Sequence, residues 1–185
     1  MTEVFFCSAP KTADRSAIAS GVRHRWKELD DIKLIELTPR ILGCDDFSFQ
    51  KQRRVAADMM AKNSVYILAD DDCLPLTDFE SGINAILEHP QFAIVSAFPS
   101  NCTIQRWTPE GYDVYEDLAV MEHHSVGGLR IIRRGAMREW PEQTGPGYDR
   151  EHCQALRDAG YRVGYSVFFR MEHLGEGKTT VWLES

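Results

Sequence analysis

The chain has 185 residues, 43% of them hydrophobic and 26% charged, which is the balance of a single globular domain with its own core. Its formal net charge of -7 disfavours broad, charge-driven binding to nucleic acid or to an anionic membrane. The first residues lack the pattern of a signal peptide, and no apolar run approaches membrane-spanning length. Five scattered cysteines with no CxxC pair indicate a reducing compartment, so we expect a cytoplasmic protein.

The first 99 residues alternate between strand patterns and helix patterns. Apolar runs predict strands at residues 3–8, 32–37, 65–69 and 91–98. Helical spacing of apolar residues predicts helices at residues 14–29, 49–62 and 79–87. Thr77 to Glu80 has the spacing of a capping box, with Thr77 as the expected cap of the third helix. This alternation predicts an α/β fold with a mainly parallel central sheet flanked by helices.

The pattern changes after Pro99. Residues 100–125 show little periodicity, which predicts a long loop of a kind that is often functional. Further along the chain, patterns predict a strand at residues 127–134, a helix from Asp149 to Gly160, and a last strand at residues 161–169. His173 and a glycine-containing tail follow that strand.

Three consecutive carboxylates, Asp70, Asp71 and Asp72, follow the apolar strand at residues 65–69. Like charges at the end of a buried strand repel one another and lose hydration, so a cation or hydrogen-bond donors must neutralise them. All-oxygen ligands suit Mg²⁺ or Mn²⁺, and open α/β sheets bind ligands at the carboxyl ends of their strands. The pattern therefore indicates a metal site, and the alternative is an acidic turn in which Asp72 acts as a cap.

In their order, these motifs resemble those of GT-A fold glycosyltransferases of the broad family-2 type. The resemblance is carried by the three aspartates, Gly127-Gly128 before a strand that ends in Arg133-Arg134, Gly147-Tyr148-Asp149 at a helix start, and the run at residues 156–163. It covers nearly the whole chain. It implies a single GT-A-like domain over residues 1–185, with a nucleotide-binding half at 1–99 and an acceptor-binding half at 100–185.

The resemblance implies a metal-dependent glycosyltransferase, with inversion expected, that moves a sugar from a nucleoside-diphosphate sugar to a hydroxyl acceptor. Asp72 is implied as the more direct metal ligand, Asp70 as shared between metal and donor, and Asp71 as part of the donor site. His173 stands where many members place a late metal ligand, and an imidazole would shift the preference from Mg²⁺ toward Mn²⁺. Without the resemblance, a surface histidine that follows a strand is an equally good interpretation of His173.

Two carboxylates at the start of one helix are candidates for the catalytic base. Inverting transfer needs a group that takes the proton of the acceptor hydroxyl, and Asp149 fits this role after the flexible Gly145-Pro146-Gly147. Glu151 is the nearby substitute. The structural alternative is that Asp149 serves only as a helix N-cap.

Two cations are candidates for binding the donor. A guanidinium fork at Arg53 would suit the diphosphate or the nucleobase, although residues 51–54 also read as a solvated helix start. Lys178 in the glycine-flanked tail would close over the diphosphate, as the corresponding tail does in relatives. The chain departs from the family at Thr38-Pro39, where members have an acidic residue that holds the nucleobase.

Three other classes compete with this interpretation. A haloacid-dehalogenase-type phosphatase would carry its aspartates on the first strand. A nucleotidylyltransferase of related fold would have a glycine-rich phosphate loop after the first strand, whereas residues 8–13 contain no glycine. A non-catalytic sugar-nucleotide-binding module would keep the pocket without depending on Asp149. The acceptor is open, and could be a protein, a glycan, a small molecule or a modified nucleic-acid base.

Overall fold

The computed structural model describes residues 2–8, 13–38, 41, 55–56, 58–59, 64–100, 103–107, 114–115, 118–120, 126–136, 148–175 and 180–184. The helices are α1 (Ala13–Lys27), α3 (Glu80–Glu88) and α4 (Tyr148–Asp158), and residues 55–56 and 58–59 are also helical. The strands are β1 (Thr2–Cys7), β2 (Ile32–Leu37), β3 (Val65–Asp70), β4 (Cys73–Pro75), β5 (Phe92–Pro99), β6 (Thr103–Trp107), β7 (Val114–Tyr115), β8 (Leu118–Val120), β9 (Leu129–Arg133), β10 (Arg162–His173) and β11 (Thr180–Glu184).

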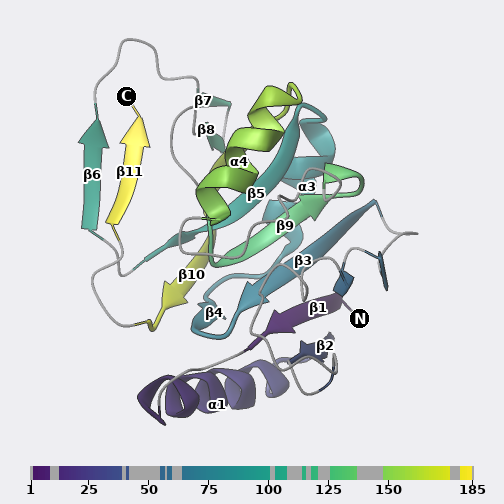
Figure 1. Ribbon diagram of the computed structural model, residues 1–185, viewed down its shortest axis with the longest axis vertical. Coiled ribbons are helices and arrows are strands. Elements are labelled where there is room, and N and C mark those ends of the chain that lie inside the picture. The colour runs from purple at the N-terminus through teal and green to yellow at the C-terminus, as the bar shows by residue number, and fades with distance from the viewer. Residues whose placement is uncertain are drawn as a thin grey trace.

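One large sheet forms the centre of the molecule, in the order β2-β1-β3-β9-β5-β10-β8-β7, and β4 pairs with the end of β10 (Figure 1). β1 pairs in parallel with β2 and β3, and β5 pairs in parallel with β10. β9 lies antiparallel between β3 and β5, so the long strands on its two sides still point the same way. The predicted α/β fold is therefore confirmed. Its sheet is mixed, because β1, β2, β3, β5 and β10 point the same way whereas β9, β8 and β4 run against their neighbours.

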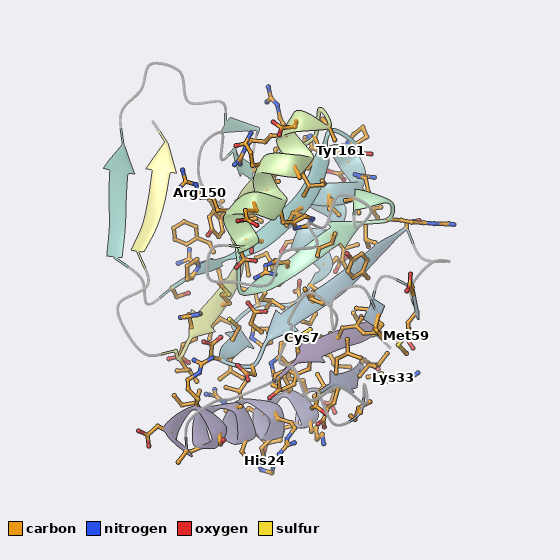
Figure 2. The ribbon with its side chains drawn as sticks, in the orientation of Figure 1. Cys7, His24, Lys33, Met59, Arg150 and Tyr161 are labelled. Atoms are coloured by element: carbon orange, nitrogen blue, oxygen red, sulfur yellow. The ribbon has the colours of Figure 1, made fainter. Side chains whose placement is uncertain are left out.

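Helices cover both faces of this sheet (Figure 1). On one face α1 and α3 bury Val22, Trp26 and Ile86, and Trp26 stacks on Phe79 with ring centroids 5.8 Å apart. On the other face α4 buries Cys153 and Leu156. Polar residues of α1 such as His24 point away from the sheet (Figure 2). Hydrophobic burial on both faces stabilises the central strands, which fixes the position of their carboxyl ends.

The structure corrects the prediction of one long loop at residues 100–125. This stretch contains the short strands β6, β7 and β8, and β8 pairs with β10 inside the large sheet. β6 pairs in parallel with β11, a strand that follows the glycine-containing tail and that the sequence patterns did not predict. These strands have two to five residues, which is too short to show a clear alternation of apolar and polar residues.

The prediction of a capping box at residues 77–80 was also wrong. The helix begins at Glu80, and Asp78 Oδ1 accepts a hydrogen bond from the Glu80 N–H at 3.0 Å. The Thr77 hydroxyl instead accepts the N–H of Arg170 on β10 at 2.9 Å. A contact across 93 residues of sequence therefore takes the hydroxyl that local spacing assigns to the helix. None of the helices in the described part of the chain has the length and apolarity that crossing a bilayer requires.

Candidate active site

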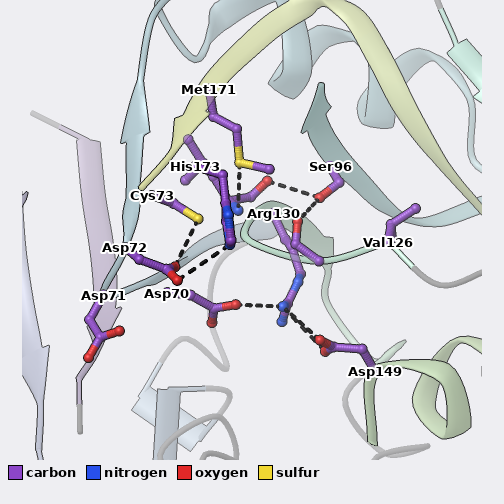
Figure 3. Close-up of polar contacts among 12 residues, drawn as sticks. Asp70, Asp71, Asp72, Cys73, Ser96, Val126, Arg130, Asp149, Met171 and His173 are labelled. Atoms are coloured by element: carbon purple, nitrogen blue, oxygen red, sulfur yellow. Dashed lines mark hydrogen bonds and ion pairs between the residues drawn. The ribbon is translucent and has the colours of Figure 1, made fainter. Parts of the chain in front are cut away.

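The three aspartates lie where β3 leaves the sheet and turns into β4 (Figure 3). Asp70 is the last residue of β3, and its N–H donates to the carbonyl of Gly128 at 3.2 Å. The indole N–H of Trp26 donates to the carbonyl of Cys73 at 2.8 Å, which ties the following residue to α1. The turn that carries Asp71 and Asp72 is thus held at both ends by segments far away in the sequence.

β10 brings His173 to this turn. His173 pairs with Cys73 in the antiparallel ladder, and the N–H of Leu174 donates to the carbonyl of Asp72 at 2.7 Å. His173 Nε2 consequently lies 3.4 Å from Asp72 Oδ2 (Figure 3). Ligands on neighbouring corners of an octahedron with bonds of about 2.1 Å lie about 3 Å apart, so this pair has the spacing for one divalent ion.

Cys73 is the third member of this cluster, and its thiol donates to Asp72 Oδ1 at 3.4 Å. Burial raises the pKa of Cys73 well above its ordinary value, and the charges of Asp72 and Asp70 raise it further. The hydrogen bond from this thiol orients the Asp72 carboxylate. The cluster therefore offers a carboxylate oxygen, an imidazole nitrogen and a thiol, and the first two suit Mn²⁺.

Asp71 points to the other side of the turn, toward α1. It is 1% exposed, and Ser8 Oγ at the end of β1 donates to its Oδ2 at 3.1 Å. Arg15, in the first turn of α1, bridges Asp71 and Asp72 with its two terminal nitrogens. The distances are 3.0 Å from Nη2 to Asp71 Oδ1 and 2.7 Å from Nη1 to Asp72 Oδ2. These two bonds neutralise part of the charge that the sequence places at the strand end.

A second arginine lies on the opposite side of Asp70 (Figure 3). Arg130 is the second residue of β9, opposite Leu68 of β3 and Ser96 of β5, and it is 1% exposed. Its Nη2 lies 2.9 Å from Asp70 Oδ2 and 3.3 Å from Asp149 Oδ1. A buried guanidinium is costly unless it is paired, so these carboxylates stabilise it where it lies.

Gly127 and Gly128, which precede β9, leave the space in which Arg130 approaches Asp149. A Cβ atom on Gly127 would lie 3.3 Å from Arg130 Nη2 and 3.4 Å from Asp149 Oδ2, in the space where these groups meet. Gly128 has a φ of +76°, and a Cβ there would lie 2.7 Å from the Met171 side chain. Ser96 Oγ donates to the carbonyl of Gly127 at 2.6 Å and so holds the turn against β5.

The charged groups around the turn have an excess of negative charge that a divalent cation would balance. Four carboxylates, those of Asp70, Asp71, Asp72 and Asp149, face the guanidinium groups of Arg15 and Arg130. These four carboxylates and two guanidinium groups sum to a formal charge of -2. A divalent ion would balance this charge, and the Asp72–His173 pair offers the matching ligands. The residues present therefore fit the metal that the sequence suggests.

The structure brings together most of the predicted site residues, namely Asp70, Asp71, Asp72, Asp149 and His173. Glu151 is exposed and lies two residues beyond Asp149, on a different side of α4. Arg53 and Lys178 lie outside the described residues. Sequence reasoning missed Arg15 and Arg130, since each pairs with carboxylates that are 19 to 60 positions away. A charged residue inside the apolar run of β9 was the only signal for Arg130.

Comparison with solved structures places the fold. The chain matches A197 from STIV over 95% of its length and 87% of that chain, with 14% identity and a TM-score of 0.55. It matches GalNAc-T7, solved with UDP, GalNAc and Mn²⁺, over 96% of its length and 45% of that chain, with 12% identity and a TM-score of 0.57. A UDP-glucose pyrophosphorylase complexed with UDP-glucose matches over 93% of this chain and 92% of that one, with 11% identity and a TM-score of 0.55.

No family model and no curated protein matches the sequence. At identities of 11 to 14%, the likeness to solved structures is a likeness of fold. Together with the strand order and the position of the aspartates, it establishes that the chain has the GT-A, or nucleotide-diphospho-sugar transferase, fold.

Proposed function

We propose that this protein is a metal-dependent glycosyltransferase that moves a sugar from a nucleoside-diphosphate sugar to a hydroxyl acceptor, with inversion. The observation that carries the proposal is the meeting of Asp72 and His173 at 3.4 Å, beside Asp70, Arg130 and Asp149. Residues from β3, β9, α4 and β10 converge at the carboxyl end of β3, the edge at which open α/β sheets bind ligands. GalNAc-T7, which shares the fold, is solved with UDP and Mn²⁺.

Asp72 and His173 would hold the ion, with Asp70 on the donor side. Bound there, a divalent ion would stabilise as a Lewis acid the negative charge that develops on the leaving diphosphate. Asp71, which Ser8 and Arg15 hold in place, would line the donor site. Arg53 and Lys178 remain proposed ligands of the diphosphate, on the strength of the sequence alone.

Asp149 is the proposed base. Its carboxylate is partly exposed, at 30%, so an acceptor hydroxyl can reach it, and Arg130 holds it from the buried side. Taking the proton from that hydroxyl would let the oxygen attack the sugar from the side opposite to the leaving group, which inverts the anomeric carbon. The contact with the Arg130 guanidinium at 3.3 Å fixes the position of the Asp149 carboxylate at the site.

The proposal is tested by thermal unfolding with a panel of nucleoside-diphosphate sugars, with and without Mn²⁺. A donor that binds the native state should raise the unfolding temperature only when Mn²⁺ is present. The stabilising donor is then incubated with the protein, and release of nucleoside diphosphate is followed in the presence of candidate acceptors. Stabilisation without any turnover would point to a non-catalytic binding module, and absence of stabilisation by every donor would contradict the proposal.

One observation supports a second candidate, a nucleotidylyltransferase. The chain spans 92% of the UDP-glucose pyrophosphorylase it resembles but only 45% of GalNAc-T7. Against it, residues 8–13 have none of the glycines of a phosphate-binding loop. Incubation with UTP and glucose 1-phosphate separates the two: a nucleotidylyltransferase releases pyrophosphate, whereas a glycosyltransferase does not.

A further inference from the structure

The guanidinium of Arg15 binds the same oxygen atom that faces the proposed metal ligand His173. Asp72 Oδ2 accepts a hydrogen bond from Arg15 Nη1 at 2.7 Å and lies 3.4 Å from His173 Nε2. Nη2 of the same side chain reaches Asp71 Oδ1 at 3.0 Å. Arg15 therefore forms a two-pronged, charge-assisted clamp on two carboxylates that are almost completely buried.

The backbone leaves little space around this oxygen. A Cβ atom on Gly175 would lie 2.5 Å from Asp72 Oδ2, 2.8 Å from His173 Cε1 and 3.1 Å from Arg15 Nη1. Gly175 thus closes the cluster from the side of β10, and only a residue without a side chain fits there. A metal ion bound between Asp72 and His173 would share Asp72 Oδ2 with the positively charged Nη1 of Arg15. Crowding and charge repulsion both oppose this arrangement.

From this geometry we infer that Arg15 is a built-in counterion that a divalent metal must displace from Asp72. The inference rests on the proposed metal site and adds a competitor to it. Arg15 holds the aspartate turn together when no metal is bound, because two adjacent buried carboxylates would otherwise repel each other. On binding, one divalent cation replaces one guanidinium at Asp72. The apparent affinity for the metal is lowered by the free energy of the contacts that Arg15 makes with the two aspartates.

The position of Arg15 permits this exchange. Its side chain is 27% exposed, whereas those of Asp71 and Asp72 are 2% and 8% exposed. It stands in the first turn of α1, at the outer edge of the site, so the flexible stem can carry the guanidinium into solvent while the carboxylates stay in place. Arg130 contrasts with it, because that residue belongs to β9, a central strand of the sheet, and is 1% exposed.

The test measures binding of Mn²⁺ alone to the purified protein, from the electron paramagnetic resonance signal of the free ion. Arg15→Gln removes the cation, and loss of a charge-assisted clamp should tighten Mn²⁺ binding by about tenfold or more. Arg23→Gln is the matched control, since Arg23 lies on the same helix but pairs with Glu36. Arg15→Met, which keeps the aliphatic stem, replaces Arg15→Gln if the latter does not fold.

Tighter Mn²⁺ binding in Arg15→Gln, or binding that appears only in this variant, supports the exchange. The gain should disappear when Asp72→Asn is added, because the exchange takes place on that carboxylate. Equal or weaker binding in Arg15→Gln, while the wild type binds Mn²⁺, overturns the inference and leaves the proposed function standing. Absence of Mn²⁺ binding from both proteins overturns the metal site itself, and with it the proposed function.

Discussion

Arg130 Nη2 lies 3.3 Å from Asp149 Oδ1, and the same nitrogen lies 2.9 Å from Asp70 Oδ2. One buried nitrogen thereby links the carboxylate at the end of β3 to the carboxylate at the start of α4. The proposed donor side and the proposed base share a cation, so the distance between them is set by the position of Arg130 in the sheet. Substitution of this residue should affect both the stability of the fold and the geometry of the site.

Arg130→Met is expected to lower the free energy of unfolding by about 3 kcal/mol, because two carboxylates lose a buried partner. Denaturant unfolding at neutral pH measures this loss. Arg134→Met is the control, since Arg134 is exposed in the turn just after the same strand and should change stability by less than about 0.5 kcal/mol. Equal stability of the two variants would show that the Arg130 contacts contribute nothing to the fold.

Asp149→Asn should retain donor binding and lose transfer by roughly 10²–10⁴-fold, the usual contribution of a general base. Calorimetry with the donor and a turnover assay separate these two effects. Glu151→Gln serves as the control, because Glu151 is exposed on another side of α4 and should leave turnover nearly unchanged. Loss of turnover in Glu151→Gln alone would move the role of the base to Glu151. Because α4 begins at Tyr148, Asp149 lies inside the helix and is not its N-cap, so unfolding of Asp149→Asn would instead assign Asp149 a structural role as the partner of Arg130.

Gly175→Ala should weaken binding of Mn²⁺ and UDP by about tenfold or more, because the new methyl group would lie 2.5 Å from Asp72 Oδ2 and force it to move. A calorimetric titration of UDP in the presence of Mn²⁺ measures the effect. Gly21→Ala is the matched control. Its Cβ has no atom within 4 Å in the middle of α1, so it should leave binding unchanged and raise stability by about 0.5–1 kcal/mol. Unaltered binding in Gly175→Ala would place the ligand away from the Asp72–His173 pair.

Glu36 on β2 should make a stability contribution that depends on pH. Burial raises the pKa of Glu36, but Lys27 and Arg23 on α1 outweigh it with hydrogen bonds and positive charge, so the net pKa is lowered. A lowered pKa in the folded state adds stability above the ordinary glutamate pKa, and this contribution is lost as the pH falls through the lowered value. Glu36→Gln should therefore cost roughly 0.5–1 kcal/mol at pH 7, and the cost should vanish in acid, where Glu36 is protonated in both the folded and the unfolded state. A stability difference that stays the same at pH 7 and in acid would contradict this assignment.

The sequence was sufficient to predict the half of the fold in which local patterns and tertiary structure agree. The strands before Asp70 are apolar runs that end in turn residues, and the structure places them within one or two residues of the predicted bounds. The acidic turn was identifiable because three like charges at the end of a buried strand need partners. The end of α4 was identifiable from Gly160, which has a φ of +87°.

The remainder depends on contacts between distant segments. Thr77 has the spacing of a helix cap, yet its hydroxyl accepts a hydrogen bond from β10. Arg15 has the sequence context of an exposed helical residue, and only the packing of α1 against the β3–β4 turn brings it to Asp72. The short strands β6, β7 and β8 are recognised from the strands that they pair with, because they are too short to carry a pattern of their own. Local patterns do not record which distant group a side chain meets.

The proposed metal site, which is the centre of this account, is tested most directly by Asp72→Asn. Calorimetric titration with UDP in the presence and absence of Mn²⁺ compares this variant with the wild type and with Asp78→Asn, in which an exposed aspartate that accepts a hydrogen bond from the first residue of α3 is replaced. Wild type and Asp78→Asn should bind UDP in a Mn²⁺-dependent manner, and Asp72→Asn should lose that dependence while it keeps its fold by circular dichroism. Unchanged Mn²⁺-dependent affinity for UDP in a folded Asp72→Asn protein would contradict the account.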